Sequence, residues 1–163
     1  MTMWARHASR MVALSARCLS AQSSSTRLPQ AISLRDGFKK INEPWSPHVG
    51  GDINDMQIKL VKLEGEFVWH DHTDEDELFL VHKGAIRMHM RDPSDATKET
   101  HVDVHEGQYI IVPRLLEHKP AAIGDAPAEV ILMEPKTTLN TGSAADSSEA
   151  VDRGLTKEEL KTI

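Results

Sequence analysis

Residues 65–77 have the sequence GEFVWHDHTDEDE, and this stretch decides the fold that we expect for the chain. Successive side chains of a β-strand point to opposite faces, so His70 and His72 would lie side by side on a strand over residues 67–72. Two neutral imidazoles placed in this way can bind one metal ion. Asp71 would face the other side of the strand, and we therefore exclude it as a ligand.

Glu77 extends the pattern. It lies five residues beyond His72, an odd spacing that would put it on the wrong face of an unbroken strand. The polar run over residues 73–76 supplies a bend, which would return Glu77 beside the histidines on the next strand. Taken alone, two histidines followed by an acidic run are weak evidence for a metal site, because such residues are common on protein surfaces.

A second segment has related features further along the chain. Five residues separate Gly107 from Pro113, and four more separate Pro113 from His118, so another histidine follows a strand-ending proline. Together the two segments resemble the two signature motifs of the cupin superfamily, the first of which continues to Gly84. The resemblance covers roughly residues 50–135.

The resemblance implies both a fold and a metal site. Cupins are jelly-roll β-barrels, so we expect an all-β protein, a small single-domain cupin of the RmlC-like type. Three histidines and one carboxylate leave an octahedral ion two open positions, which suits Fe, Mn or Ni, while a tetrahedral arrangement would suit Zn. We therefore predict one divalent metal ion as the cofactor. The family's ligand positions carry over with their residue types intact, and they are His70, His72, Glu77 and His118.

The sequence departs from the cupin pattern at three places. Leu115 stands where the second motif usually has glycine, so we expect the turn there to be reshaped. Ala122 stands where asparagine is often found, four residues after the histidine. Gly65 and His70 are separated by four residues rather than five. None of these differences removes a ligand.

The rest of the pattern also predicts β-structure. Short apolar runs recur at intervals of about ten residues between Gly and Pro turns, which is typical of a sandwich or barrel. We expect strands over residues 53–63, 67–72, 78–81, 85–90, 100–104, 109–112 and 130–133. The chain then divides into a leader (1–30), an N-terminal arm (31–52), the barrel (53–135) and a polar tail (136–163). Thr156 and Glu159 have the spacing of a capping box, which predicts a short C-terminal helix.

The leader differs in composition from the rest of the chain. Residues 1–35 contain five Arg and no Asp or Glu, and Arg6, Arg10 and Arg17 fall on one side of a helix. A basic, acid-free and Ser-rich start is typical of an organelle transit peptide, so we predict a mitochondrial location. A disordered tail or an interfacial helix, with a cytoplasmic location, stays open as the alternative. The single cysteine, Cys18, lies in this segment and excludes an intramolecular disulfide.

Beyond residue 35 the chain is acidic, with 14 Lys and Arg against 25 Asp and Glu. Such a body repels phosphate backbones, so we expect no nucleic-acid partner. No apolar run has the length of a membrane span, so we expect a soluble protein without a membrane partner. Apolar residues on both faces of the strand over 78–81 indicate that this sheet is covered from outside, and we therefore predict a homodimer.

Two classes of function stay open. The first is a mononuclear metalloenzyme of the dioxygenase or isomerase type, which binds a small oxygenated or sugar-like acid and polarises two of its oxygens. The second is a non-catalytic module that binds or senses a metal or a small molecule, since this fold serves such roles as well. We favour the enzyme. The sequence identifies no catalytic residue and no further polar group that would support the predicted ligands.

Overall fold

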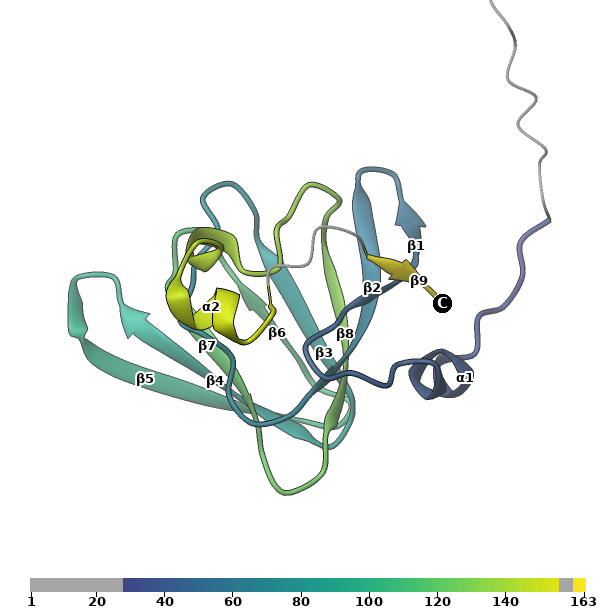
Figure 1. Ribbon diagram of the computed structural model, residues 1–163, viewed down its shortest axis with the longest axis horizontal. Coiled ribbons are helices and arrows are strands. Elements are labelled where there is room, and N and C mark those ends of the chain that lie inside the picture. The colour runs from purple at the N-terminus through teal and green to yellow at the C-terminus, as the bar shows by residue number, and fades with distance from the viewer. Residues whose placement is uncertain (1–27, 156–159) are drawn as a thin grey trace, which may run out of the picture. The chain divides into compact units, whose positions relative to one another are not determined.

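The structure is a computed structural model that describes residues 28–155 and 160–163. Residues Ala31–Ile163 form one compact unit. Most of the predicted leader, Cys18 included, and the capping box at 156–159 lie outside the described residues. In the described part (Figure 1), the elements in chain order are α1 (Leu34–Lys39), β1 (His48–Ile53), β2 (Met56–Leu63), β3 (Glu77–Lys83), β4 (Ala85–Asp92), β5 (Asp95–His105), β6 (Tyr109–Val112), β7 (His118–Ala122), β8 (Ala128–Pro135), the 3₁₀ helix η1 (Gly142–Ala144), α2 (Ser148–Asp152) and β9 (Lys161–Thr162).

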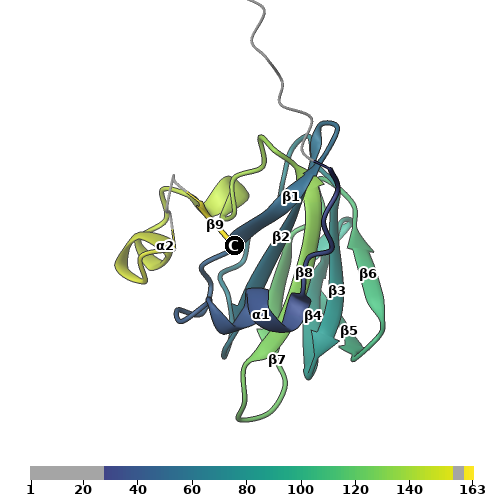
Figure 2. The same cartoon turned by 90° about the vertical axis from the view of Figure 1, so that its right-hand side faces the viewer.

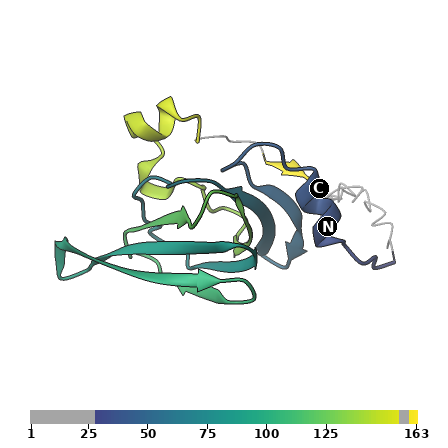
Figure 3. The ribbon, with the colours of Figure 1, turned by 90° about the horizontal axis from the view of Figure 1, so that it is seen from below.

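These strands form two sheets (Figures 1 and 2). The larger sheet has the strand order β6-β3-β8-β2-β1-β9, and the smaller sheet has the order β5-β4-β7. Neighbouring strands are antiparallel except for β1 and β9, which are parallel. The long β4–β5 hairpin projects beyond the larger sheet, as Figure 3 shows from below. The predicted all-β, cupin-like fold is therefore confirmed.

One apolar core lies between the two sheets. Along β8, buried and half-buried residues alternate, as expected for a strand with one face turned inward. Val61, Phe79 and Val130 of the larger sheet pack in one cluster with Ile86 and Met88 of the smaller sheet. None of these side chains is more than 4% exposed. Burial of this apolar surface fixes the spacing of the two sheets and hence the interior in which the site lies.

The outer face of the larger sheet is covered by α1, which begins after the N-cap Ser33. Phe38 of α1 and the following Ile41 pack against Leu60 of β2 in a separate apolar cluster. Phe38 also stacks on His82 of β3, with ring centroids 5.4 Å apart. Part of the outer apolar surface is thus covered by the same chain, and the homodimer stays a prediction. No described helix is both long and apolar enough to cross a membrane.

The predicted strand over residues 67–72 is not formed. This segment meets its neighbour β7 through one isolated bridge, between His70 and His118, and one hydrogen bond from the Phe67 N–H to the carbonyl of Pro120. β7 is only five residues long and contains Pro120, which has no N–H to donate, so it cannot support a continuous ladder on this side. The two ligand histidines therefore lie on an irregular segment rather than on a strand.

Other boundaries also differ from the prediction. Residues 53–63 are divided between β1 and β2 by a turn in which Asn54 has a φ of +57°, an angle that asparagine tolerates. The sequence does not indicate β7, because proline usually ends a strand. Pro120 is accepted there because β7 is an edge strand of the smaller sheet. In the tail, the short helix α2 begins after the N-cap Ser147, ahead of the predicted capping box.

Leu115 adopts a backbone conformation that usually requires glycine. Its φ is +66°, in the left-handed region where a side chain is strained, and its side chain is 65% exposed. The turn is held by the Leu115 N–H, which donates to the carbonyl of His72 at 2.8 Å. The position therefore keeps the conformation that glycine favours, even though leucine occupies it.

Leu115→Gly should raise the free energy of unfolding by about 1 kcal/mol, because glycine adopts this backbone without strain and little buried surface is lost. Urea unfolding followed by circular dichroism would measure the change. Leu115→Ala is the matched control, since alanine removes the exposed side chain but keeps the backbone penalty. Equal stabilisation by both variants would contradict the assignment of strain to the backbone.

Candidate metal centre

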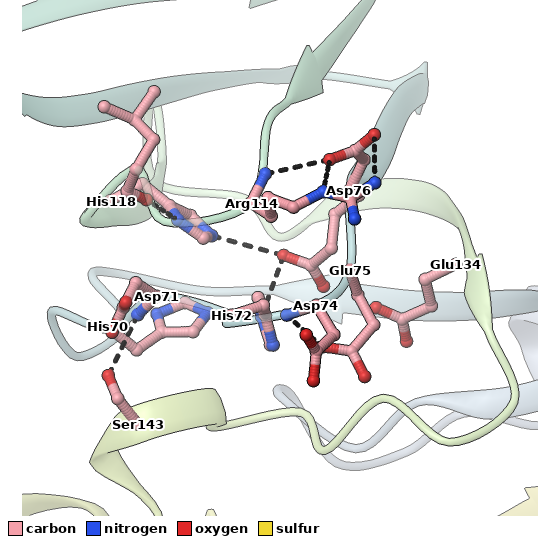
Figure 4. A network of polar contacts seen from close by, with 12 residues as sticks. His70, Asp71, His72, Asp74, Glu75, Asp76, Arg114, His118, Glu134 and Ser143 are labelled. Atoms are coloured by element: carbon pink, nitrogen blue, oxygen red, sulfur yellow. Dashed lines mark hydrogen bonds and ion pairs between the residues drawn. The ribbon is translucent and has the colours of Figure 1, made fainter.

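The four predicted ligands converge inside the barrel, and Figure 4 shows the three histidines among them. One donor atom from each of His70, His72, Glu77 and His118 lies within 4.8 Å of all the others. None of the four residues is more than 5% exposed. Asp71 is not part of the cluster, in agreement with the prediction that it faces the other way.

The backbone brings the two sequence motifs together. The N–H of His70 donates to the carbonyl of His118 at 3.0 Å, and the N–H of His118 donates to the carbonyl of His70 at 2.8 Å. Glu77 is the first residue of β3 and is paired with Val112 of β6. The carbonyl of His72 accepts the hydrogen bond from Leu115. The segments that carry the four predicted metal ligands are therefore positioned by main-chain contacts with β7, with β6 and with the turn at Leu115.

Two of the imidazole rings are oriented by main-chain carbonyls. Nδ1 of His70 lies 3.1 Å from the carbonyl oxygen of Val68, and Nδ1 of His118 lies 2.9 Å from that of Leu116. Because a carbonyl only accepts, the Nδ1 atoms carry the protons and leave Nε2 unprotonated in the neutral rings. The Nε2 lone pairs are then available to a metal ion, with the carbonyls as the supporting contacts.

The close approach of these acceptors indicates that a cation belongs among them. Oε2 of Glu77 lies 3.2 Å from Nε2 of His118 and 3.1 Å from Nε2 of His72. Unprotonated acceptors at this distance repel unless a proton or a metal ion lies between them. Nε2 of His72 is buried without a hydrogen bond of acceptable geometry. Imidazole nitrogen and carboxylate oxygen are ligands for divalent transition metals, so these residues fit the predicted cofactor.

The electrostatics of the cluster suit the same ion. Burial, together with the nearby His118 ring, lowers the pKa of His70 to about 3, so this ring is neutral at pH 7. Burial opposes ionisation of Glu77, but contacts with Glu134 and the histidines outweigh it and hold the pKa of Glu77 well below its usual range. Burial likewise opposes a charged His72, yet the Glu77 carboxylate raises the pKa of that ring. A metal ion would displace the His72 proton.

The C-terminal tail holds the segment that carries His70 and His72. The N–H of Ser143 donates to the carbonyl of Asp71 at 2.9 Å, and Oγ of Ser143 accepts from the N–H of Asp71 at 3.1 Å. Gly142 lies so close that an added Cβ would overlap the Asp71 carbonyl. The tail thus replaces the strand pairing that this segment lacks.

Arg114 holds the acidic loop that precedes Glu77. Its main-chain N–H and its Nε both donate to Oδ1 of Asp76, at 2.9 and 3.1 Å. The hydrogen bonds from Arg114 lower the pKa of Asp76, so this carboxylate is ionised at neutral pH. The pair is exposed and screened by solvent, so it adds little stability, but it ties the turn around Leu115 to the start of β3.

Sequence reasoning missed a buried charged pair beside the ligands. Nζ of Lys59 donates to Oε1 of Glu134 at 2.6 Å, and neither side chain is more than 1% exposed. Burial and the neighbouring Glu77 raise the pKa of Glu134 well above its usual range. Strand alternation could have found the pair: Lys59 falls on the inward face of β2 with Val61, and Glu134 falls on that of β8 with Leu132.

Comparison with known proteins agrees with this architecture. A family model described as "Cupin domain" matches residues 59–134. The crystal structure of a cupin-2 domain containing protein from Shewanella frigidimarina NCIMB 400 is 38% identical, with a TM-score of 0.57, and the match covers 64% of this chain and 94% of that one. The Fe³⁺ complex of the hydroquinone 1,2-dioxygenase PnpCD has a TM-score of 0.58 at 19% identity, covering 74% of this chain and 36% of that one, and shows the fold alone.

A curated relative is the uncharacterized protein YdbB of Bacillus subtilis (strain 168), which is 32% identical over 68 residues. That match covers 42% of this chain and 55% of YdbB, so this chain spans about half the length of that relative. The shared part supports a common barrel core. It assigns no activity, substrate or partner to the chain.

Replacing His70 and His72 together by alanine should abolish bound metal, because half of the donor set is removed. Elemental analysis of purified protein would measure this against the wild type. The double variant His101→Ala with His105→Ala is the matched control, since both residues are exposed on β5 away from the cluster. If the His70/His72 variant kept its metal, the ligand assignment would be wrong.

Lys59→Met should lower the free energy of unfolding by roughly 2 kcal/mol, because the buried Glu134 loses its hydrogen-bond partner and is left unsatisfied. In the double variant Lys59→Met with Glu134→Gln, part of the lost free energy of unfolding should be recovered. A double-mutant cycle measured by urea unfolding would test this. Lys136→Met provides the control, since its pair with Asp52 is exposed and screened by solvent, so its loss should change stability far less. If Lys59→Met and Lys136→Met lowered the free energy of unfolding equally, burial of the Lys59–Glu134 pair would not explain the effect.

Proposed function

This chain belongs to the cupin family, and from this we propose that it is a mononuclear metalloenzyme that acts on a small oxygenated molecule. The proposal is carried by the convergence of the four donors beside a small cavity that is partly open to solvent. Two of them, His70 and Glu77, also line that cavity. A molecule in the cavity would therefore meet the metal centre directly.

His70, His72, Glu77 and His118 would hold one divalent ion, with Fe, Mn, Ni and Zn as the candidates. Such an ion would supply Lewis acidity and open coordination positions for oxygen atoms. The chain's own residues keep the site in one geometry. The main-chain hydrogen bonds between His70 and His118 fix the backbone of these two residues, and Ser143 holds the backbone of Asp71, next to His72. Burial of the donors keeps bulk water away from the substrate.

The cavity residues favour a dioxygenase over an isomerase. Isomerisation of a hydroxy or keto compound needs a general base that moves a proton. Among the described residues that line the cavity, the titratable ones are His70 and Glu77, and both belong to the proposed ligand set. A dioxygenase instead transfers both atoms of O₂ to its substrate. The Fe³⁺-bound hydroquinone 1,2-dioxygenase has the same fold, so the architecture is compatible with this chemistry.

Two further proposals concern the whole protein. The Arg-rich, acid-free leader supports mitochondrial targeting, which cell fractionation would test. The apolar side chains of Tyr109 and Ile111 are 62% and 56% exposed on β6, at the edge of the larger sheet, and support a homodimer. Light scattering on the purified protein would detect the dimer, and a monomer would contradict it.

Protein loaded with Fe(II) or Mn(II) should consume O₂ when it is offered a substrate from a panel of phenols and keto, hydroxy and sugar acids. An oxygen electrode would record uptake, and mass spectrometry would detect oxygenated product. His118→Ala, which lacks one ligand, should lose roughly 100-fold or more of the rate, whereas His101→Ala should not.

Absence of both O₂ uptake and substrate change across the panel would contradict the enzyme. If the protein still bound metal in that case, the non-catalytic binding module would take its place.

A further inference from the structure

We propose that the cavity beside the metal centre takes a small substrate that is apolar and uncharged except at the one edge facing the metal ion. This inference rests on the proposed function and names the substrate class of the same site. It narrows the sequence-based expectation of a small oxygenated or sugar-like acid, because the walls of the cavity offer almost nothing to a polyol or to a second charge.

The walls are apolar side chains from the inward faces of the larger sheet. Val61 and Leu63 come from β2, Phe79 from β3 and Leu132 from β8, and all four line the cavity. The same residues belong to the buried core, so their positions are set by packing rather than by a ligand. The cavity has a volume of about 30 Å³ and is partly open to solvent, so only a small ligand can enter it.

Trp45, from the arm before β1, adds ring surface to the cavity. Its indole packs against Phe67, with ring centroids 4.8 Å apart. Its Nε1–H already donates to the carbonyl of Glu64 at 2.9 Å, so it offers a ligand only an apolar face. Trp45 also has a φ of +57°, a backbone conformation that bulky residues rarely adopt and that often marks a binding site. Its N–H donates to the carbonyl of Lys62, which holds this conformation.

Charge at the site is limited to the metal centre. No cationic side chain lines the cavity among the described residues. Lys59 also faces the interior, but its Nζ lies 2.6 Å from Glu134. Arg87 and Arg114 are paired with aspartates outside the cavity. A divalent ion with Glu77 as its one carboxylate ligand keeps positive charge and can accept one anionic oxygen group, whereas a second charge would be buried without a partner.

Hydroxyl groups away from the metal would also lack partners. Outside the ligand set, Asn140 is the lining residue in the described part that has a free polar side chain, since the indole N–H of Trp45 is already used. A sugar-like acid would bury several hydroxyls against Val61, Phe79 and Leu132 without hydrogen bonds, which is costly. A ring or short chain with oxygens at one end would instead place them toward His70 and Glu77 and its apolar part against these walls.

A set of three probes tests the charge and polarity of the site. With Zn(II)-loaded protein, which carries out no redox chemistry, titration calorimetry should show catechol binding at least about tenfold more tightly than 3,4-dihydroxybenzoate. The second probe differs only by a carboxylate on the ring edge away from the hydroxyls. Gluconate, a sugar acid, should not bind detectably. Binding of 3,4-dihydroxybenzoate or gluconate as tight as that of catechol would overturn the proposal.

A matched pair of variants tests whether the cavity is the site. Val61→Leu adds one methylene to a cavity wall and should weaken catechol binding at least about fivefold, because it fills space that the ligand needs. Val130→Leu makes the same change at a buried core valine that does not line the cavity, and should leave catechol affinity within about twofold. Thermal unfolding and metal content of both variants control for folding. An equal effect of the two changes, or none from Val61→Leu, would contradict the cavity as the site.

The two proposals fail in different ways. If wild-type protein binds no metal in elemental analysis, the proposed function fails. The cavity is then tested in the metal-free protein with phenol as the probe, by nuclear magnetic resonance titration. If Val61→Leu weakens phenol binding and Val130→Leu does not, the apolar site is supported. If Val61→Leu leaves phenol affinity unchanged, the apolar site is contradicted.

Discussion

Two main-chain hydrogen bonds between His70 and His118 hold this site together. They join a segment that belongs to neither sheet to the start of β7, an edge strand, and so bring the two sequence motifs into contact. One hydrogen bond from Leu115 and two between Ser143 and Asp71 add to the support of the segment. The ligand positions are therefore set by the backbone, and the crowding of acceptor atoms around Glu77 is a consequence that a cation can relieve.

The interior of the barrel is divided between charged and apolar surface. The inward positions of β2 and β8 change from Lys59 and Glu134 at one end to Val61, Leu63 and Val130 along the rest of the strands. The cavity is lined by apolar residues of these strands and by His70 and Glu77 of the metal centre, but not by Lys59 or Glu134. Buried carboxylates are costly unless a positive charge accompanies them. Lys59 donates to Glu134, whose raised pKa favours the neutral acid beside Glu77, and the proposed metal ion would accompany the Glu77 carboxylate.

Residues outside the matched cupin domain contribute to the site. Trp45 from the arm lines the cavity, and Asn140 lines it from the tail. Gly142 and Ser143 pack against the backbone of Asp71 and hold the segment of the ligand histidines. These contacts attach the arm at Trp45 and the tail at residues 140–143 to the barrel. They also show how a barrel shared with many proteins can be given its own pocket by the chain on either side of it.

The sequence by itself determined the fold class, and its two motif spacings, which resemble those of cupins, indicated the four side chains that converge. Residue type, short spacing and apolar alternation are local properties and can be recognised without the tertiary structure. Other features were decided by the tertiary structure. Residues 67–72 can form a strand only if β7 supplies main-chain hydrogen bonds to them, and Pro120 has no N–H to donate. Lys59 and Glu134 lie 75 residues apart and meet only through the register of β2 with β8. The polarity of the cavity likewise depends on which side chains distant strands bring beside the ligands, and such non-local contacts are fixed only when the two sheets pack.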